Sequence, residues 1–143
     1  MNGLYDGPVW VAHVLAVLGL LELGPELIHS FAPDGGAFAI AGLHQQAGRA
    51  TIIGLFAWAG ATQLCWALII LSVAFRYRVF LRPMLALMAL EKSLIALNGW
   101  LLKPNPGLHH PPALYAALVA VPFLLALLAA SFAPSSRHHE EMP

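Results

Sequence analysis

The sequence contains few charged residues. Only 10% of its 143 residues are Asp, Glu, Lys or Arg, against about 25% in a typical soluble domain. A chain this poor in charge cannot cover a water-facing surface, so we expect an integral membrane protein rather than a soluble one. The seven acidic and seven basic residues also cancel. Without a basic excess there is no field to attract nucleic acid, which is therefore not expected as a partner.

Cysteine is nearly absent as well. Cys65 is the only one in the chain, which excludes an intrachain disulfide and a CxxC metal or redox motif. The chain also contains no Gly-rich phosphate loop and no Ser-His-Asp order. These absences imply no particular cofactor and leave open whether the protein is an enzyme.

Long apolar runs are what the sequence has in abundance. Each contains about 20 residues or more, the length that crosses roughly 30 Å of hydrocarbon as a helix. Backbone polar groups in lipid must be satisfied within the segment, so each run predicts a helix. The expected fold class is all-α, a single membrane domain over residues 1–143 built as a bundle of four transmembrane helices. The predicted helices cover residues 9–29, 50–75, 83–102 and 112–132, with a longer outer loop at 30–49.

Arginine is concentrated in one short connection. Arg76, Arg78 and Arg82 lie between the second and third runs, and another arginine follows the fourth. The connections predicted on the opposite side contain one arginine and one lysine, Arg49 and Lys103. The positive-inside rule then predicts that both termini are cytoplasmic, in a multi-pass protein of the bacterial inner membrane.

Polar residues interrupt the apolar runs, mostly in the predicted outer half. Glu22, Glu26 and His29 are spaced i, i+4 and i+7, so they share one helix face. A charge at the centre of a span costs about 2.5–3.5 kcal/mol, so such faces should meet one another rather than lipid. We therefore predict a polar pocket in the outer half. Its predicted residues are Glu22, Glu26, His29, Arg49, Glu91, Asn98 and Tyr115.

The simplest packing of these helices also predicts particular pairs. Glu26 should lie near Arg49, and Glu22 near Asn98. Lys92 should lie near Gln63 or a carboxylate, and the fourth run should cover the bundle or contact a partner. The alternative is that the whole cluster forms only internal salt bridges that fix the helix register.

The segment "ELIH" invites a metal interpretation. A Glu-x-x-His pair is the ligand spacing of di-iron four-helix bundles, but those bundles need a second copy and two further glutamates. This chain has no second copy, which argues against a dinuclear site. A mononuclear metal site using Glu22, Glu26, His29 and His44 stays open.

The chain resembles a known class of membrane proteins in its overall organisation. Four predicted spans, about 140 residues, short loops and a polar first span are similar to the small DoxX-like bacterial membrane proteins. Some relatives in that group are subunits of thiosulfate–quinone oxidoreductases. No motif in this chain allows a functional residue to be carried over from them.

These observations favour a small membrane module over an enzyme. We predict an accessory subunit or a binder of a small amphipathic ligand, such as a lipid headgroup or a quinone, held in the outer polar pocket. Expected partners are the lipid bilayer and either a second copy of the chain or a larger membrane complex. Two alternatives remain open: a membrane enzyme or metal site built on Glu22, Glu26 and His29, and a component of proton-linked transport.

Overall fold

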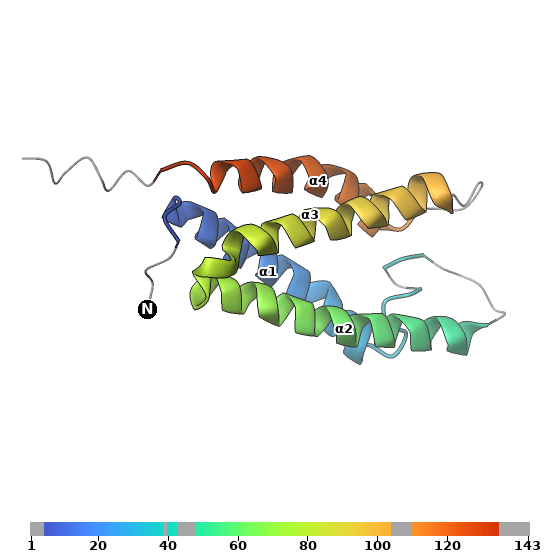
Figure 1. The fold of residues 1–143 in the computed structure, drawn as a ribbon. Coiled ribbons are helices and arrows are strands. Elements are labelled where there is room, and N and C mark those ends of the chain that lie inside the picture. Colours follow the sequence, from blue (N-terminus) through green and yellow to red (C-terminus); the bar gives the residue numbers. More distant parts are fainter. Residues whose placement is uncertain (1–4, 39, 43–47, 104–109, 135–143) are drawn as a thin grey trace, which may run out of the picture.

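The computed structural model describes residues 5–38, 40–42, 48–103 and 110–134. All regular secondary structure in these residues is helical, which confirms the all-α prediction. The helices are α1 (Val9–Phe31), α2 (Arg49–Phe75), α3 (Leu81–Leu97) and α4 (Pro112–Ala130), with a 3-10 turn η1 (Arg78–Phe80) before α3 and a π-helical turn η2 (Asn98–Leu102) after it (Figure 1).

Three of these helices, α1, α2 and α4, are long and apolar enough to cross a membrane. The third predicted span is divided: α3 has 17 residues, and η2 continues the helical path to Leu102. In η2 the Lys103 amide donates to the Asn98 carbonyl at 2.8 Å, the five-residue step of a π turn. Prolines begin two helices, with Pro8 capping α1 and Pro112 at the first position of α4, where a missing N–H costs little.

The helices form two hairpins. α1 packs mainly against α2, and α3 packs mainly against α4, as Figure 1 shows. We call one end of the molecule the arginine end, because it holds the α2–α3 connection with Arg76, Arg78 and Arg82. The other is the loop end, where the α1–α2 connection lies.

The hydrophobic core joins the two hairpins in the half nearer the arginine end. It combines the first turns of α1 and α3 with the last turns of α2 and α4. Its most buried large members are Leu15, Ile70, Leu81, Leu85, Met88 and Leu124, each no more than 2% exposed. Burying a side chain of this size is worth about 1.5–3 kcal/mol in water. In lipid this gain is replaced by close packing, so the core fixes how the hairpins meet.

A single glycine sets the approach of α1 and α2 toward the loop end. A Cβ atom at Gly60 would lie 2.6 Å from the His29 Cβ and 2.9 Å from the backbone N of Ser30. Nothing lies within 4 Å of the corresponding position at Gly54. Gly60 therefore allows the two helices to pack closely at this point, and its lack of a side chain leaves room for His29.

The described part of the α1–α2 connection is built from turns. Asp34 accepts hydrogen bonds from the backbone N–H groups of Gly36, at 3.0 Å, and Phe38, at 3.3 Å. Gly35 and Gly36 have positive φ angles of 60° and 73°, which glycine adopts without strain. Gly35, Gly36 and Ala37 are all buried, so the connection folds back onto the α1–α2 hairpin.

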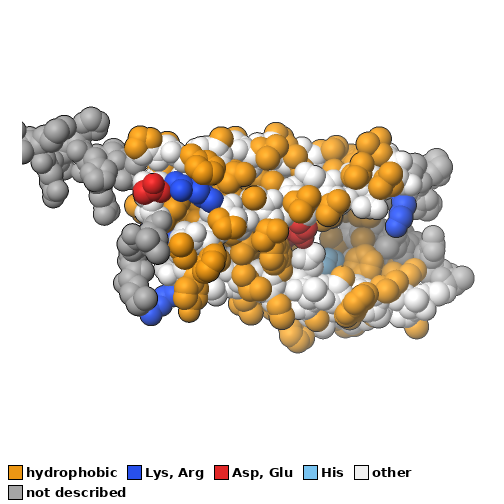
Figure 2. Space-filling view, in the orientation of Figure 1, with side chains coloured by type: hydrophobic (Ala, Val, Ile, Leu, Met, Phe, Trp, Pro, Cys, Tyr) orange, Lys and Arg blue, Asp and Glu red, His pale blue; other side chains and the backbone are white. Residues whose placement is uncertain are grey.

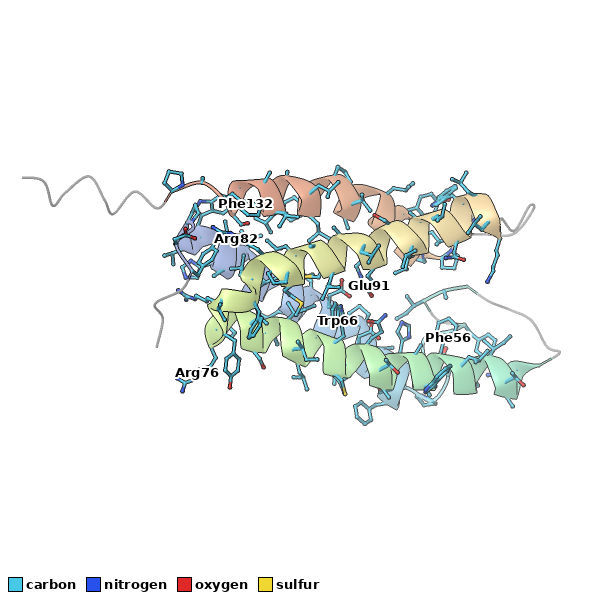
Figure 3. All side chains as sticks on the ribbon, in the orientation of Figure 1. Phe56, Trp66, Arg76, Arg82, Glu91 and Phe132 are labelled. Carbon is cyan, nitrogen blue, oxygen red and sulfur yellow. The ribbon has the colours of Figure 1, made fainter. Side chains whose placement is uncertain are left out.

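Arg82, which lies beside Phe132 in Figure 3, connects the segment before α1 with the end of α4 at the arginine end. Its Nη2 lies 2.7 Å from Asp6 Oδ1 and donates at 3.0 Å to the carbonyl of Ser131, which caps α4. Its guanidinium also stacks 4.5 Å from the centre of the Phe132 ring. One of the arginines expected to set topology therefore has a structural role as well.

Candidate functional site

A chain of polar side chains crosses the middle of the bundle. The Lys92 Nζ lies 2.7 Å from Glu22 Oε1 and 3.6 Å from Glu91 Oε2. Gln63 Nε2 donates to Glu91 Oε1 at 3.1 Å. These four residues, which we call the polar network, connect α1, α2 and α3. The predicted contact of Lys92 with a carboxylate is present, and Figure 3 shows Glu91 on the side of α3 that faces α2.

The network is shielded from the surroundings on most sides. The side chains of Lys92, Glu22 and Glu91 are 15%, 23% and 21% exposed. Mutual attraction is strong in such a low-dielectric setting, and each member needs its partner because an unpaired buried charge is costly. The network therefore holds the two hairpins together beyond the apolar core.

Glu26 lies one turn beyond Glu22 and, unlike Glu22, forms no ion pair in the described residues. It is only 8% exposed, yet its Oε2 has no hydrogen-bond partner in the part of the chain that the structure describes. Ionisable groups of its own helix, His29 and Glu22, and of α3, Lys92 and Glu91, are near enough to influence it electrostatically. A buried polar atom without a partner costs about 1–3 kcal/mol, which makes Glu26 the residue that most needs explanation.

His29 is fixed in place by the α1–α2 connection. Its Nδ1 lies 2.6 Å from the Gly35 carbonyl oxygen, and because a carbonyl can only accept, Nδ1 must carry the proton. The ring also meets Phe56 edge-on, with centroids 5.2 Å apart. In the neutral ring Nε2 is then left as a hydrogen-bond acceptor.

The space between the hairpins opens toward the loop end. Figure 2 shows the molecule hollowed between α3 and α2 on that side, with acidic and imidazole side chains near the inner edge of the hollow. The hydrophobic core closes the opposite side, because Leu15, Ile70 and Leu85 are each 0% exposed. Acidic and imidazole side chains thus border this hollow, which we call the recess, and the core closes it toward the arginine end.

A groove between α2 and α3 leads outward from the polar network. It has a volume of about 520 Å³ and is lined mostly by apolar side chains, together with Thr62, Gln63 and Glu91. A second groove of about 450 Å³ adjoins it, since both share Ile69 and Leu87. The indole N–H of Trp66 is buried at the first groove without a hydrogen-bond partner among the described residues. The polar network is therefore within reach of an apolar cleft on the face of the bundle.

Arg49 does not join these residues. Its guanidinium lies 4.5 Å from the centre of the Phe38 ring, and no ion pair links it to Glu26 in the described residues. The predicted Glu26–Arg49 pair is thus absent there. The α1–α2 connection is the physical reason, because it folds Phe38 back beneath the start of α2.

Asn98 and Tyr115 also lie apart from the polar network. Asn98 Nδ2 donates to the Leu94 carbonyl of its own helix at 2.8 Å, while the expected partner of Asn98, Glu22, pairs with Lys92. Tyr115 meets the Trp100 ring edge-on with centroids 5.4 Å apart, and His110 adds a third ring. These residues form an aromatic cluster between η2 and α4, of the kind found near a membrane interface.

Two members of the polar network, Gln63 and Lys92, were not among the predicted pocket residues. The sequence contained a feature that pointed to each of them. Gln63 follows Arg49 and Phe56 at intervals of seven residues on one face of α2, and Lys92 is the only lysine or arginine within the apolar part of its run. Ser30 and Trp66 are half-buried, and each has a buried polar atom without a hydrogen-bond partner among the described residues; nothing in the sequence pointed to either of them.

The residues predicted for a mononuclear metal site lie partly outside the described part of the chain. His44 lies outside the described residues. Among the residues that are described, no group of three or more His, Cys, Asp or Glu side chains is placed to hold a metal ion. Glu26 and His29 lie near each other, but a site that also uses His44 stays a prediction.

Known proteins give no information about this site. No protein-family model matches the chain, and no curated protein or solved structure is significantly similar to it. The resemblance to DoxX-like membrane proteins stays a prediction.

Proposed function

We propose that this protein is a small membrane module that binds the polar head of an amphipathic ligand in the recess around Glu26. The observation that carries the proposal is the unpaired Oε2 of a glutamate that is only 8% exposed. Charged groups within membrane helices are costly and commonly mark a functional site. Glu22 and Glu91 have protein partners, whereas Glu26 Oε2 has none among the described residues, and a ligand would supply one.

The α2–α3 groove supports an amphipathic ligand rather than a small polar one. Its walls are apolar along most of their length, while Gln63 and Glu91 line the part next to the polar network. A molecule with a polar head and an apolar chain would match both parts, and it would enter sideways from the bilayer. Pockets that are mostly apolar with a few placed polar groups are typical ligand sites.

The closed core makes transport a weaker explanation. A proton or ion path would have to continue from the network toward the arginine end, where Leu15, Ile70, Leu85 and Met88 are each no more than 1% exposed. These side chains offer no group that can carry a proton. Binding requires access from one side only, which the recess has.

We further propose the setting in which the protein works. Helix α3 together with η2 would form a fourth span, with both termini in the cytoplasm of a bacterium and the loop end facing outward. The positive-inside pattern of Arg76, Arg78 and Arg82 supports this orientation. In this setting the chain would act as an accessory subunit or as a homo-oligomer that presents its ligand to a partner.

Native mass spectrometry of the chain extracted with its surrounding bilayer tests the binding proposal. We expect a small molecule to remain bound to the unmodified chain and to be lost from Glu26→Gln. Glu140→Gln makes the same chemical change outside the described helices and should keep the molecule. Equal occupancy in both variants, or no bound molecule in the unmodified chain, would refute the proposal.

A further inference from the structure

The chemistry of the recess restricts the head that it can accept. Three carboxylates, Glu22, Glu26 and Glu91, are near one another there, and the basic groups beside them in the described residues are the Lys92 ammonium and the His29 ring. The nearest arginine on α2, Arg49, is held over the Phe38 ring instead. When its carboxylates are ionised, the recess therefore carries more negative than positive charge.

The hydrogen-bond capacity that is left over points the same way. Glu26 Oε2 and Glu91 Oε2 are buried without hydrogen-bond partners among the described residues. His29 Nδ1 already donates to Gly35, so the neutral ring offers only an acceptor. The unused groups that can donate are the Ser30 hydroxyl and the indole N–H of Trp66, which lies farther out at the groove. Of the two carboxylate oxygens, Glu91 Oε2 lies 3.6 Å from Lys92 Nζ, which leaves Glu26 Oε2 as the acceptor that neither a hydrogen bond nor an ion pair reaches among the described residues.

From these two observations we infer that the ligand is a long-chain amphiphile whose head is an ammonium group. This inference rests on the proposed function and adds the chemical class of the ligand. The ammonium would donate to Glu26 Oε2 and offset the excess of carboxylates. Its chain would extend past Glu91, which lines the α2–α3 groove, into that groove. A phosphate or carboxylate head would bring further negative charge and further acceptors to a low-dielectric site, which is unfavourable.

Burial of Glu26 favours an ammonium head over an uncharged one. A carboxylate that is 8% exposed is shielded from water, so a donor that reaches it replaces no strong solvent contact. Charge-assisted hydrogen bonds of this kind are shorter and about twice as strong as neutral ones. A hydroxyl head would supply a donor but no charge, so it should bind less tightly than an ammonium.

Binding of three simple probes tests the inference: dodecylammonium, dodecanol and dodecyl phosphate. The full chain is placed in nanodiscs of zwitterionic lipid, and affinity is measured by calorimetry against empty nanodiscs. We expect dodecylammonium to bind tightest in the unmodified chain. Glu26→Gln should weaken it about 10- to 100-fold, the loss expected for one hydrogen bond to a charged group. Glu26→Asp and Glu140→Gln should retain most of the binding.

The outcomes separate this inference from the proposed function. Tightest binding of dodecanol or dodecyl phosphate would overturn the ammonium inference and leave a ligand site in place. Binding of none of the probes, with no molecule carried through purification, would overturn both. The order of the three heads in the unmodified chain decides the question even if Glu26→Gln fails to fold.

Discussion

Removing the cation of the polar network should destabilise the bundle strongly. In Lys92→Met the apolar volume is roughly kept, but Glu22 loses the ammonium that lies 2.7 Å from it. Glu91 loses a weaker contact at 3.6 Å and keeps its hydrogen bond from Gln63. The damage should therefore fall mainly on Glu22, which is left as an uncompensated charge between helices.

The size of the effect follows from burial. Breaking a buried ion pair by removing one partner costs about 3–5 kcal/mol, whereas replacing both partners with neutral groups is often close to neutral. The side chains of Lys92 and Glu22 are 15% and 23% exposed, so we expect a loss near the lower end, about 3 kcal/mol. The double variant Glu22→Gln/Lys92→Met should recover most of it and unfold within about 1 kcal/mol of the unmodified chain.

Unfolding by dodecyl sulfate in mixed micelles, followed by circular dichroism, measures these free energies. A double-mutant cycle over the two positions then gives the coupling between them. If Lys92→Met is as stable as the unmodified chain, or if adding Glu22→Gln brings no recovery, the two side chains do not form a buried pair and the reasoning fails.

Three further changes probe other parts of the fold. Gly60→Ala should lower the free energy of unfolding by about 1–3 kcal/mol, because the new Cβ would fall 2.6 Å from the His29 Cβ in a packed contact. Gly54→Ala places a Cβ where no atom lies within 4 Å, so it should be neutral or stabilising in the same unfolding assay. Arg82→Gln should cost about 1.5–3 kcal/mol through its charged hydrogen bond to the α4 end and lower the melting temperature, and an unchanged melting temperature would contradict its bridging role. The pKa of Asp6 is held below its usual value by a hydrogen bond from the Asp6 backbone N–H and by the Arg82 guanidinium. The contribution of Asp6 to folding stability is therefore present at neutral pH and lost as the pH falls below about 4. Melting temperatures from pH 6 to pH 3 should show this small loss in the unmodified chain and not in Asp6→Asn.

The helices could be predicted from the sequence because their cause is local. Length, apolar composition and prolines at the starts determine each one, and the first helix, for example, runs from Val9 to Phe31 where residues 9–29 were predicted. The end of the third run is different. The π turn begins at Asn98 and depends on how the Lys103 amide is satisfied, which apolar content alone does not reveal.

The pairing of polar side chains was only partly predictable. Lys92 had to find a carboxylate, because no other nearby group offsets its charge, but the packing predicted from the sequence paired Glu22 with Asn98 rather than with Lys92. Arg49 lies at a helix end, where the α1–α2 connection decides its neighbours, and the sequence does not show that Phe38 folds back beneath it. The predicted pairing therefore identified the kind of partner that Lys92 has, but it was wrong for Glu22 within the spans and for Arg49 next to a loop.

An experimental structure of the full chain, extracted in native-membrane particles without detergent, tests the central claim most directly. The feature to inspect is the space beside Glu26 Oε2. We predict the head of a bound amphiphile within hydrogen-bond distance of that oxygen, with its chain between α2 and α3. An empty recess, with Glu26 paired to a side chain of its own protein, would contradict the claim.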